Sequence, residues 1–297
     1  MGGNEPRCSR ALSAIVARMS ASSRPPPPHP GLYLGTSSWS SGDWEGVFYP
    51  KGTPAAARLS HYATRFRTVE VDATFYRIPS EALVRKWRGD LPEGFFFSAK
   101  APRVITHDKG LVDAGEDLSA FLRAMDQMGD RLGPILFQFP YFKKGSGTSE
   151  ELFLERLGRF LPLLPSGYRF ALEIRNKTWL REPLLELLAA RGVALALIDH
   201  PWMPRAGEYM ERVDPATADF AYIRWLGDRY GIEKRTKTWD KVIVDRTREM
   251  KAWVPVVRGL LSRGMTVFGY FNNHYAGHAP SSIELFAETW GAADGGE

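Results

Sequence analysis

The sequence is poor in cysteine and in long apolar segments. Cys8 is the single cysteine among 297 residues, so no disulfide can form within one chain. This usage is typical of proteins in a reducing compartment, and we expect a cytoplasmic location. No apolar run approaches the roughly 20 residues that a membrane-spanning helix needs, so no membrane association is expected.

The common local fingerprints of enzyme active sites are also missing. We find no glycine-rich dinucleotide loop after a strand, no Walker loop and no His-Glu-x-x-His pair. The segment Gly35-Thr-Ser37 resembles the start of a nucleophile elbow, but the closing glycine is absent. Any active site must therefore be assembled from residues that lie far apart in the sequence.

Excess positive charge is concentrated at the amino terminus. The chain carries a net charge of +5, and residues 1–30 supply +3 of it through four arginines against Glu5. These residues also contain the run Pro25 to Pro28, and we expect them to be a disordered tail; a targeting peptide is the alternative. Residues 31–291 then form one folded domain, for which the high pI is weak evidence of nucleic-acid binding.

Short apolar runs that end in polar residues recur along this domain. Eight of them are strand-like, near 32–37, 68–73, 95–100, 134–139, 169–174, 193–198, 219–225 and 265–271. Helical patterns lie between most of them, and this alternation predicts a parallel sheet. Eight strand–helix units predict a single α/β domain of the (β/α)8, TIM-barrel type with a closed sheet.

Two of the helical segments are irregular. Residues 200–218 contain three prolines, so the sixth helix is expected to be short or missing. Residues 240–263 form the longest helical pattern, in which Pro255 is expected to cause a kink or a split. The charged segment 226–238 is a long loop, and such loops in compact domains are commonly functional or mobile.

The carboxyl ends of barrel strands meet at one rim, where TIM-barrel active sites lie. We expect catalytic roles there for four side chains: Glu70, His107, Glu173 and Asp199. A larger group at or just beyond the strand ends is expected to bind substrate: Thr36, Trp39, Tyr76, Lys100, Arg103, Gln138, Arg175, Trp179, Arg224, Asn272 and Asn273.

The chemistry of these residues leaves several roles open. Clustered carboxylates near apolar residues suit general acid–base catalysis, and arginine forks suit phosphate or carboxylate groups. The structural alternative is an ion pair between Glu173 and an arginine across the barrel mouth. His274 and His278 are spaced like a metal-binding pair on a helix, but Gly277 and Pro280 argue against a helix there. The cofactor therefore stays unknown, with a divalent metal as one option.

Several long motifs resemble one known family. They are Gly35-Thr-Ser-Ser-Trp39, Val69-Glu-Val-Asp-Ala-Thr-Phe-Tyr76, Phe97-Ser-Ala-Lys-Ala-Pro-Arg103, Glu173-Ile-Arg-Asn-Lys-Thr-Trp179 and Tyr270-Phe-Asn-Asn273. These motifs and their order resemble those of the YecE-like family of unknown function, and the resemblance extends from about Leu32 to Ala287. The resemblance implies a TIM-type barrel related in shape to the endonuclease IV and xylose isomerase barrels. It implies no activity.

Three functions are consistent with the sequence. The favoured hypothesis is a hydrolase-type enzyme, with or without a metal, that acts at the rim on an anionic substrate such as a nucleic acid or a sugar phosphate. The second is a metal-free barrel that processes or binds carbohydrate through a carboxylate pair. The third is a non-catalytic nucleic-acid binder that uses the basic segment 228–237 and the tail. The oligomeric state is not predicted.

Overall fold

A computed structural model describes residues 27–293. The expected tail falls almost entirely outside these residues. Eight strands form one parallel sheet, and each pairs with its neighbour in sequence except at one seam. The strands are β1 (Leu32–Thr36), β2 (Thr68–Val71), β3 (Phe96–Lys100), β4 (Leu132–Gln138), β5 (Phe170–Glu173), β6 (Ala194–Asp199), β7 (Phe220–Trp225) and β8 (Thr266–Phe271). Each overlaps a predicted run, and the predicted TIM-type α/β fold is confirmed.

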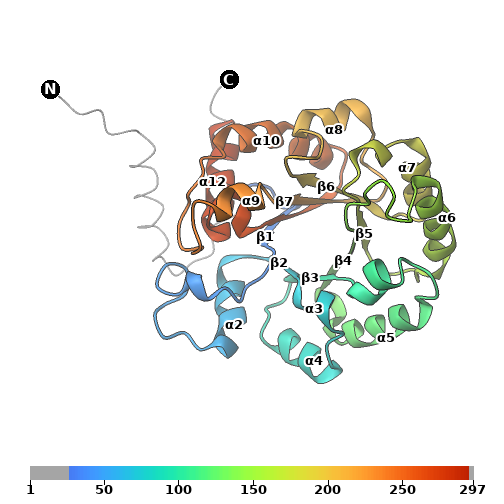
Figure 1. Ribbon diagram of the computed structural model, residues 1–297. Helices are drawn as coiled ribbons and strands as arrows, with labels where there is room; N and C mark the ends of the chain where they lie inside the picture. The colour runs from blue at the N-terminus through green and yellow to red at the C-terminus, as the bar shows by residue number, and fades with distance from the viewer. Residues whose placement is uncertain (1–26, 294–297) are drawn as a thin grey trace.

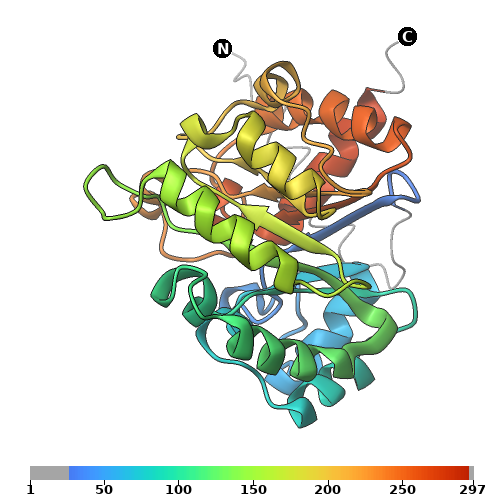
Figure 2. The same ribbon diagram turned by 90° about the vertical axis from the view of Figure 1, so that its right-hand side faces the viewer.

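The longer helices surround the strands on the outside of the barrel, and three short helices, 73–76, 229–233 and 273–276, lie in the loops that follow β2, β7 and β8 (Figure 1). In chain order the helices are α2 (Ala55–Arg65), α3 (Ala73–Tyr76), α4 (Glu81–Gly89), α5 (Gly115–Met125), α6 (Glu150–Phe160), α7 (Glu182–Ala189), α8 (Ala206–Arg212), α9 (Arg229–Glu233), α10 (Thr247–Ser262), α11 (Asn273–Ala276) and α12 (Ala279–Ala292). Viewed from the side, α5 and α6 lie along the outer surface of the sheet (Figure 2). None of the helices in the described part of the chain has the length and apolarity needed to cross a membrane.

Two helical expectations can be compared with this structure. The sixth helix, α8, is short, as predicted. Of the kink or split expected at Pro255, the split is wrong, because α10 is a single helix with Pro255 inside it. Pro255 and Lys251, whose carbonyl loses its usual partner, both lie on the exposed side of α10. Water can solvate that carbonyl there, so the helix tolerates the proline.

The barrel interior and the helix layer form separate cores. Residues that alternate along the strands point inward and pack together, among them Leu136, Ala171, Ala196, Tyr222, Phe268 and Tyr270. At the amino-terminal end the aromatic rings of Tyr33, Phe96 and Phe268 fill the barrel. Higher up, the Tyr270 hydroxyl bonds Thr68 Oγ1 at 2.8 Å and Ser98 Oγ at 2.6 Å. The interior is therefore a packed core up to the rim.

A tyrosine hydroxyl joins the two strands at the seam, β1 and β2. Tyr62 of α2 accepts from the Thr36 amide at 2.8 Å and donates to the Thr68 carbonyl at 3.0 Å. The strands approach closely here, since a Cβ atom on Gly35 would lie 2.2 Å from the Thr68 oxygen. Glycine therefore permits the approach, and the buried hydroxyl takes the place of ladder bonds.

The Tyr62→Phe variant tests this role. Loss of the hydroxyl leaves the Thr36 amide and the Thr68 carbonyl buried without this partner, so the free energy of unfolding should fall by about 1–3 kcal/mol. Hydrogen exchange of the Thr36 amide should also accelerate. Tyr209→Phe is the matched control, because the Tyr209 hydroxyl bonds only Ile198 of β6. Equal Thr36 exchange in both variants would contradict the seam role.

Candidate functional site at the carboxyl-terminal rim

A buried arginine links two buried glutamates across the upper end of the barrel. Arg224 of β7 donates through Nη1 to Glu173 Oε2 at 2.5 Å and through Nη2 to Glu70 Oε1 at 2.6 Å. Both glutamates are fully buried, and Arg224 is 3% exposed. Strands β2, β5 and β7 thus contribute one charged side chain each to a single cluster, because their inward positions reach the same height in the barrel.

The remaining oxygens of the two glutamates are also occupied. Tyr222 donates its hydroxyl to Glu70 Oε2 at 2.6 Å, and Arg175 donates Nε to Glu173 Oε1 at 2.9 Å. Burial alone raises the pKa of Glu173, but the charges of Arg224 and Arg175 outweigh it and lower the pKa to about 2. Each carboxylate oxygen binds a donor, so proton transfer by either glutamate would require one of these contacts to open.

A second charged pair lies beside this cluster. Lys100 Nζ is 3.8 Å from Asp72 Oδ1 and 4.0 Å from the centre of the Phe75 ring. Burial and the nearby charge of Glu70 raise the pKa of Asp72. Burial lowers the pKa of Lys100, although Asp72 partly opposes the shift. Both pKa values therefore move towards neutrality, as is common for groups that transfer protons.

His107 lies close to several cations. Burial lowers the pKa of His107 to about 4, and the charges of Lys100 and Arg103 lower it further. Its Nδ1 is 2.9 Å from Thr106 Oγ1, and its ring packs edge-on against Phe75. The imidazole is therefore neutral at physiological pH and lies in a positive electrostatic environment.

Some buried polar atoms of this region have no hydrogen-bond partner. They are Arg224 Nε and Asp72 Oδ1, both in the described part of the chain. The Arg175 side chain is 32% exposed. Its two Nη groups make no hydrogen bond to residues 27–293 beyond the Nε contact with Glu173. The two Nη groups of Arg175 can therefore bind a ligand at the mouth of the barrel.

Several predicted site residues lie elsewhere or have structural contacts. Asp199 accepts from Trp253 Nε1 at 2.7 Å, on the helix side of β6. Trp179 stacks on Phe142, and Trp39 packs against Trp87. The others are as follows: Thr36 at the seam, Gln138 donating to the Phe139 carbonyl, Arg103 paired with Asp108 on the surface, Tyr76 exposed, and Asn272 and Asn273 accepting the amides of His274 and Ala279.

The structure thus brings together Glu70, Glu173, Arg224, Arg175 and Lys100, with His107 near them. The site residues predicted from the sequence include neither Tyr222 nor Asp72. The signal for Tyr222 was its position two residues before Arg224, which places both side chains on one face of the strand. In residues 27–293 no three or more His, Cys, Asp or Glu side chains form a group that could hold a metal ion. His274 and His278 have different partners, Glu233 and Ser281.

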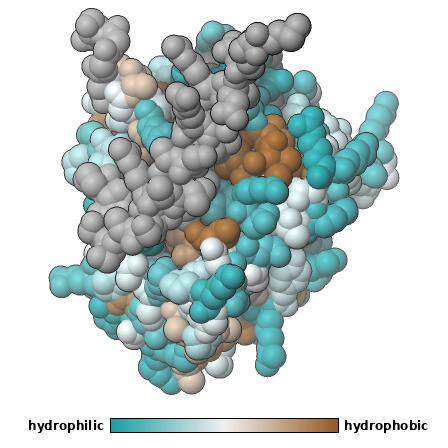
Figure 3. Space-filling view, turned by 90° about the vertical axis from the view of Figure 1, so that its left-hand side faces the viewer, coloured by the Kyte–Doolittle hydropathy of each residue, from teal (hydrophilic) through white to brown (hydrophobic). Residues whose placement is uncertain are grey.

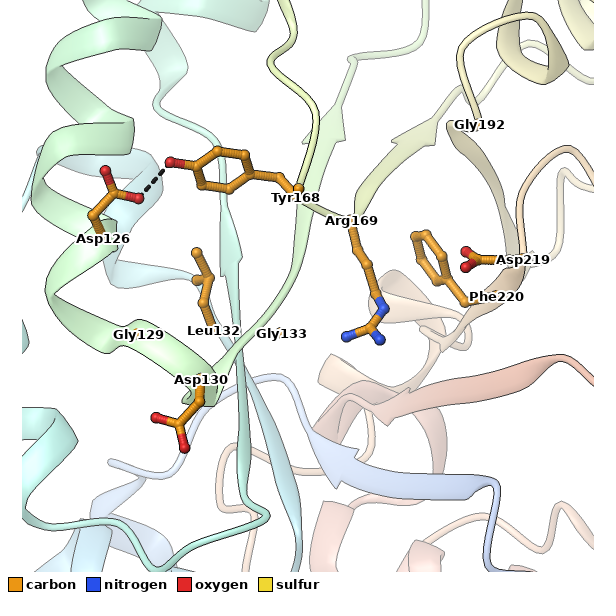
Figure 4. Close-up of a pocket in the computed structure, with 11 residues that line it drawn as sticks. Asp126, Gly129, Asp130, Leu132, Gly133, Tyr168, Arg169, Gly192, Asp219 and Phe220 are labelled. Atoms are coloured by element: carbon orange, nitrogen blue, oxygen red, sulfur yellow. Dashed lines mark hydrogen bonds between the residues drawn. The ribbon is translucent and has the colours of Figure 1, made fainter.

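A hollow of about 710 Å³ lies at the opposite, amino-terminal end of the barrel. Figure 4 shows the Arg169 guanidinium directed into it, and Tyr168 bonded to Asp126. The Arg169 guanidinium lies 5.7 Å from the centre of the Phe96 ring and 5.9 Å from that of Phe268. Because these rings fill the barrel floor, we interpret the hollow as the place where cation–π contacts cap the core.

Comparisons with known proteins agree with this fold. Residues 33–296 match the family described as "Protein of unknown function DUF72". The chain is 27% identical to the UPF0759 protein YunF of Bacillus subtilis, over 86% of this chain and 94% of that one. It is 26% identical to the UPF0759 protein YecE of Escherichia coli K12, over 62% of this chain and 65% of that one.

Solved structures of the same family are also similar. A crystal structure of a Thermotoga maritima protein superposes with a TM-score of 0.67 at 26% identity, over 86% of this chain and 97% of that one. An Enterococcus faecalis protein superposes with a TM-score of 0.67 at 22% identity, over 88% and 95%. Since the family match spans nearly all of the folded domain, the chain belongs to the DUF72 family of proteins of unknown function.

Proposed function

We propose that the protein is a hydrolase-type enzyme that acts on an anionic, phosphate-bearing substrate at the carboxyl-terminal rim. The charge of the rim segments carries the proposal. These segments follow the strands and comprise residues 37–54, 72–80, 101–114, 139–149, 174–181, 200–205, 226–246 and 272–278. They contain sixteen Lys and Arg against nine Asp and Glu, a net +7, whereas the whole chain carries +5. Positive charge gathered around one opening attracts anions and speeds their association.

Two cations of the mouth are suited to hold the phosphate group. Arg175 offers its unoccupied Nη groups, while its Nε bond to Glu173 fixes the guanidinium in place. Lys100 adds a point charge, and its side chain is only 11% exposed. A fork and a point charge together match the geometry of phosphate oxygens, and partial burial reduces screening by salt.

In this proposal Asp72 and His107 move protons, and the buried cluster holds the site rigid. Asp72 has a raised pKa and its side chain is 37% exposed, so it can accept a proton from an attacking water molecule. His107 is neutral and can relay a proton. Glu70 and Glu173 act through Arg224 and Arg175 as positioning residues. A carbohydrate-cleaving role would need two carboxyl groups open to the mouth, and these two glutamates are fully buried.

Calorimetric titration with ribose 5-phosphate tests the anion site. We expect Arg175→Gln to weaken binding by roughly tenfold or more, because a charge-assisted hydrogen bond contributes about 1.5–3 kcal/mol. Arg181→Gln is the matched control, since Arg181 lies in the same rim segment but pairs with Glu150 on the surface. Equal affinities of the two variants, or no binding of the phosphate by the native protein, would reject the site.

A panel of phosphate monoesters and diesters tests the catalytic part. Release of phosphate or of the alcohol by the native protein, and its loss in Asp72→Asn, is the expected result. Asp108→Asn is a suitable control because Asp108 is exposed and pairs with Arg103. If Asp72→Asn retains full turnover of a cleaved ester, the assigned proton acceptor is wrong.

A further inference from the structure

Exposed aromatic side chains lie only at the rim within residues 27–293. They are Tyr76, Tyr141, Trp202 and Tyr230, between 50% and 78% exposed. Each follows the carboxyl end of a strand, namely β2, β4, β6 and β7. Outside the rim segments, the exposed large apolar side chains of the described residues are aliphatic: Leu83, Leu163 and Met210. On the part of the face in Figure 3 that is not drawn in grey, hydrophobic atoms lie in separate patches among hydrophilic ones. Large aromatic rings left open to solvent at one place are typical of a binding surface.

Two of these rings are neighbours. The Tyr141 and Trp202 ring centres are 6.4 Å apart, with a tilt of 60°. Their segments follow β4 and β6, and β5, whose segment carries Arg175, lies between these two strands in the sheet. Trp202 is held by its own loop, since its amide donates to His200 Nδ1 and its ring packs edge-on against His200. The pair is therefore positioned beside the proposed phosphate site.

The charge of Arg175 also affects His200, the residue that packs against Trp202. Burial lowers the pKa of His200, and the charge of Arg175 lowers it further. His200 packs against Trp202, so the charge of Arg175 acts on the side chain that contacts the indole. One side of the mouth thus combines two exposed rings, which can stack on a planar group, with a cation that can bind an anion.

We propose that Tyr141, Trp202 and Arg175 form a subsite for a nucleoside phosphate, with the base against the rings and the phosphate on the guanidinium. This inference rests on the proposed function and specifies its substrate class. Stacking suits a nucleobase because every base presents a flat π face, and it adds affinity without hydrogen-bond readout. The same chemistry occurs in a free nucleotide and in a single-stranded nucleic acid.

Tryptophan fluorescence reports this subsite directly. Trp202 is the single exposed tryptophan of the nine in the chain, and all nine lie within the described residues. Adenosine 5′-monophosphate should quench its emission, and Trp202→Phe should remove the quenching while keeping a ring for stacking. Calorimetry should show that adenosine 5′-monophosphate binds roughly ten- to a hundredfold more tightly than ribose 5-phosphate, which lacks the base.

Variants separate stacking from anion binding. Trp202→Ala and Tyr141→Ala should abolish the preference for the base but leave the affinity for ribose 5-phosphate unchanged, and Trp202→Phe should retain the preference. If a pentanucleotide binds much more tightly than the mononucleotide, the natural ligand is a single-stranded nucleic acid. Similar affinities would identify a free nucleotide.

Other results would overturn the inference. Equal affinity for the two phosphates in the native protein would reject the base subsite and leave the proposed function standing. Quenching by a methyl glycoside but not by the nucleotide would assign the rings to carbohydrate. If neither phosphate compound binds, both the subsite and the proposed function fail.

Discussion

Replacing Arg224 with methionine is expected to lower the free energy of unfolding by about 3–5 kcal/mol. The guanidinium lies between Glu70 and Glu173, and all three side chains are almost completely buried. Its loss leaves two carboxylates in the barrel without their shared counter-charge, and burial of an unpaired charge is very costly. Urea denaturation at pH 7 measures the change.

The expected loss depends on the carboxylates that remain. The triple variant Arg224→Met, Glu70→Gln, Glu173→Gln removes all three charges, and it should recover a large part of the lost stability. Arg88→Met is the matched control, because Arg88 pairs with Asp130 on the surface and should cost at most about 1 kcal/mol. A loss no larger than that of Arg88→Met would show that the cluster contributes little to folding.

Acidification between pH 6.5 and pH 4 is expected to destabilise the protein through His278. Burial lowers the pKa of His278 to about 4, with a small opposing effect of Asp240. Its Nδ1 accepts the Ser281 amide at the start of α12, and its Nε2 is buried without a hydrogen-bond partner among residues 27–293. In the unfolded chain the pKa is near 6.5, so protons bind there first and favour unfolding.

The two pKa values of His278 determine how the free energy of unfolding changes with pH. The stabilisation that depends on neutral His278 is complete above pH 6.5 and is lost as the pH falls towards 4, and this residue contributes roughly 3 kcal/mol to the loss. His278→Asn removes the titrating group and keeps a good helix N-cap. The stability of the native protein should therefore fall more steeply than that of the variant over this range. Parallel pH profiles in denaturant titrations would contradict the assignment.

The strand positions could be read from the sequence because each strand is a short apolar run with its own ending. The partners of the inward side chains could not be predicted in the same way, and β7 is an example. Tyr222 and Arg224 share one face of the strand, and the predicted set included only the charged one. Aromatic residues are common in strands, so Tyr222 could not be recognised as a partner of a carboxylate from its position alone. Its hydroxyl bond to Glu70 depends on a residue 152 positions away.

The sequence also could not show which residues at the strand ends face the mouth of the barrel. Lys100 and Arg175 could be placed at the mouth because strand ends meet there in any barrel. Asp199 also ends a strand, but its carboxylate accepts the Trp253 indole on the helix side. Alternation along a strand gives two faces, and only packing against α10 fixes which face a terminal residue uses.

The sequence by itself determined the eight parallel strands, the charged strand ends and the family, because these depend on local periodicity and on motif order. The tertiary structure decided which charges are occupied and which are free. Arg224 is paired with two glutamates from distant strands, whereas the Nη groups of Arg175 bind no side chain of residues 27–293. The seam held by Tyr62 and the Tyr141–Trp202 pair were likewise decided there. Contacts between strands and loops far apart in the chain depend on barrel closure, which no local pattern encodes.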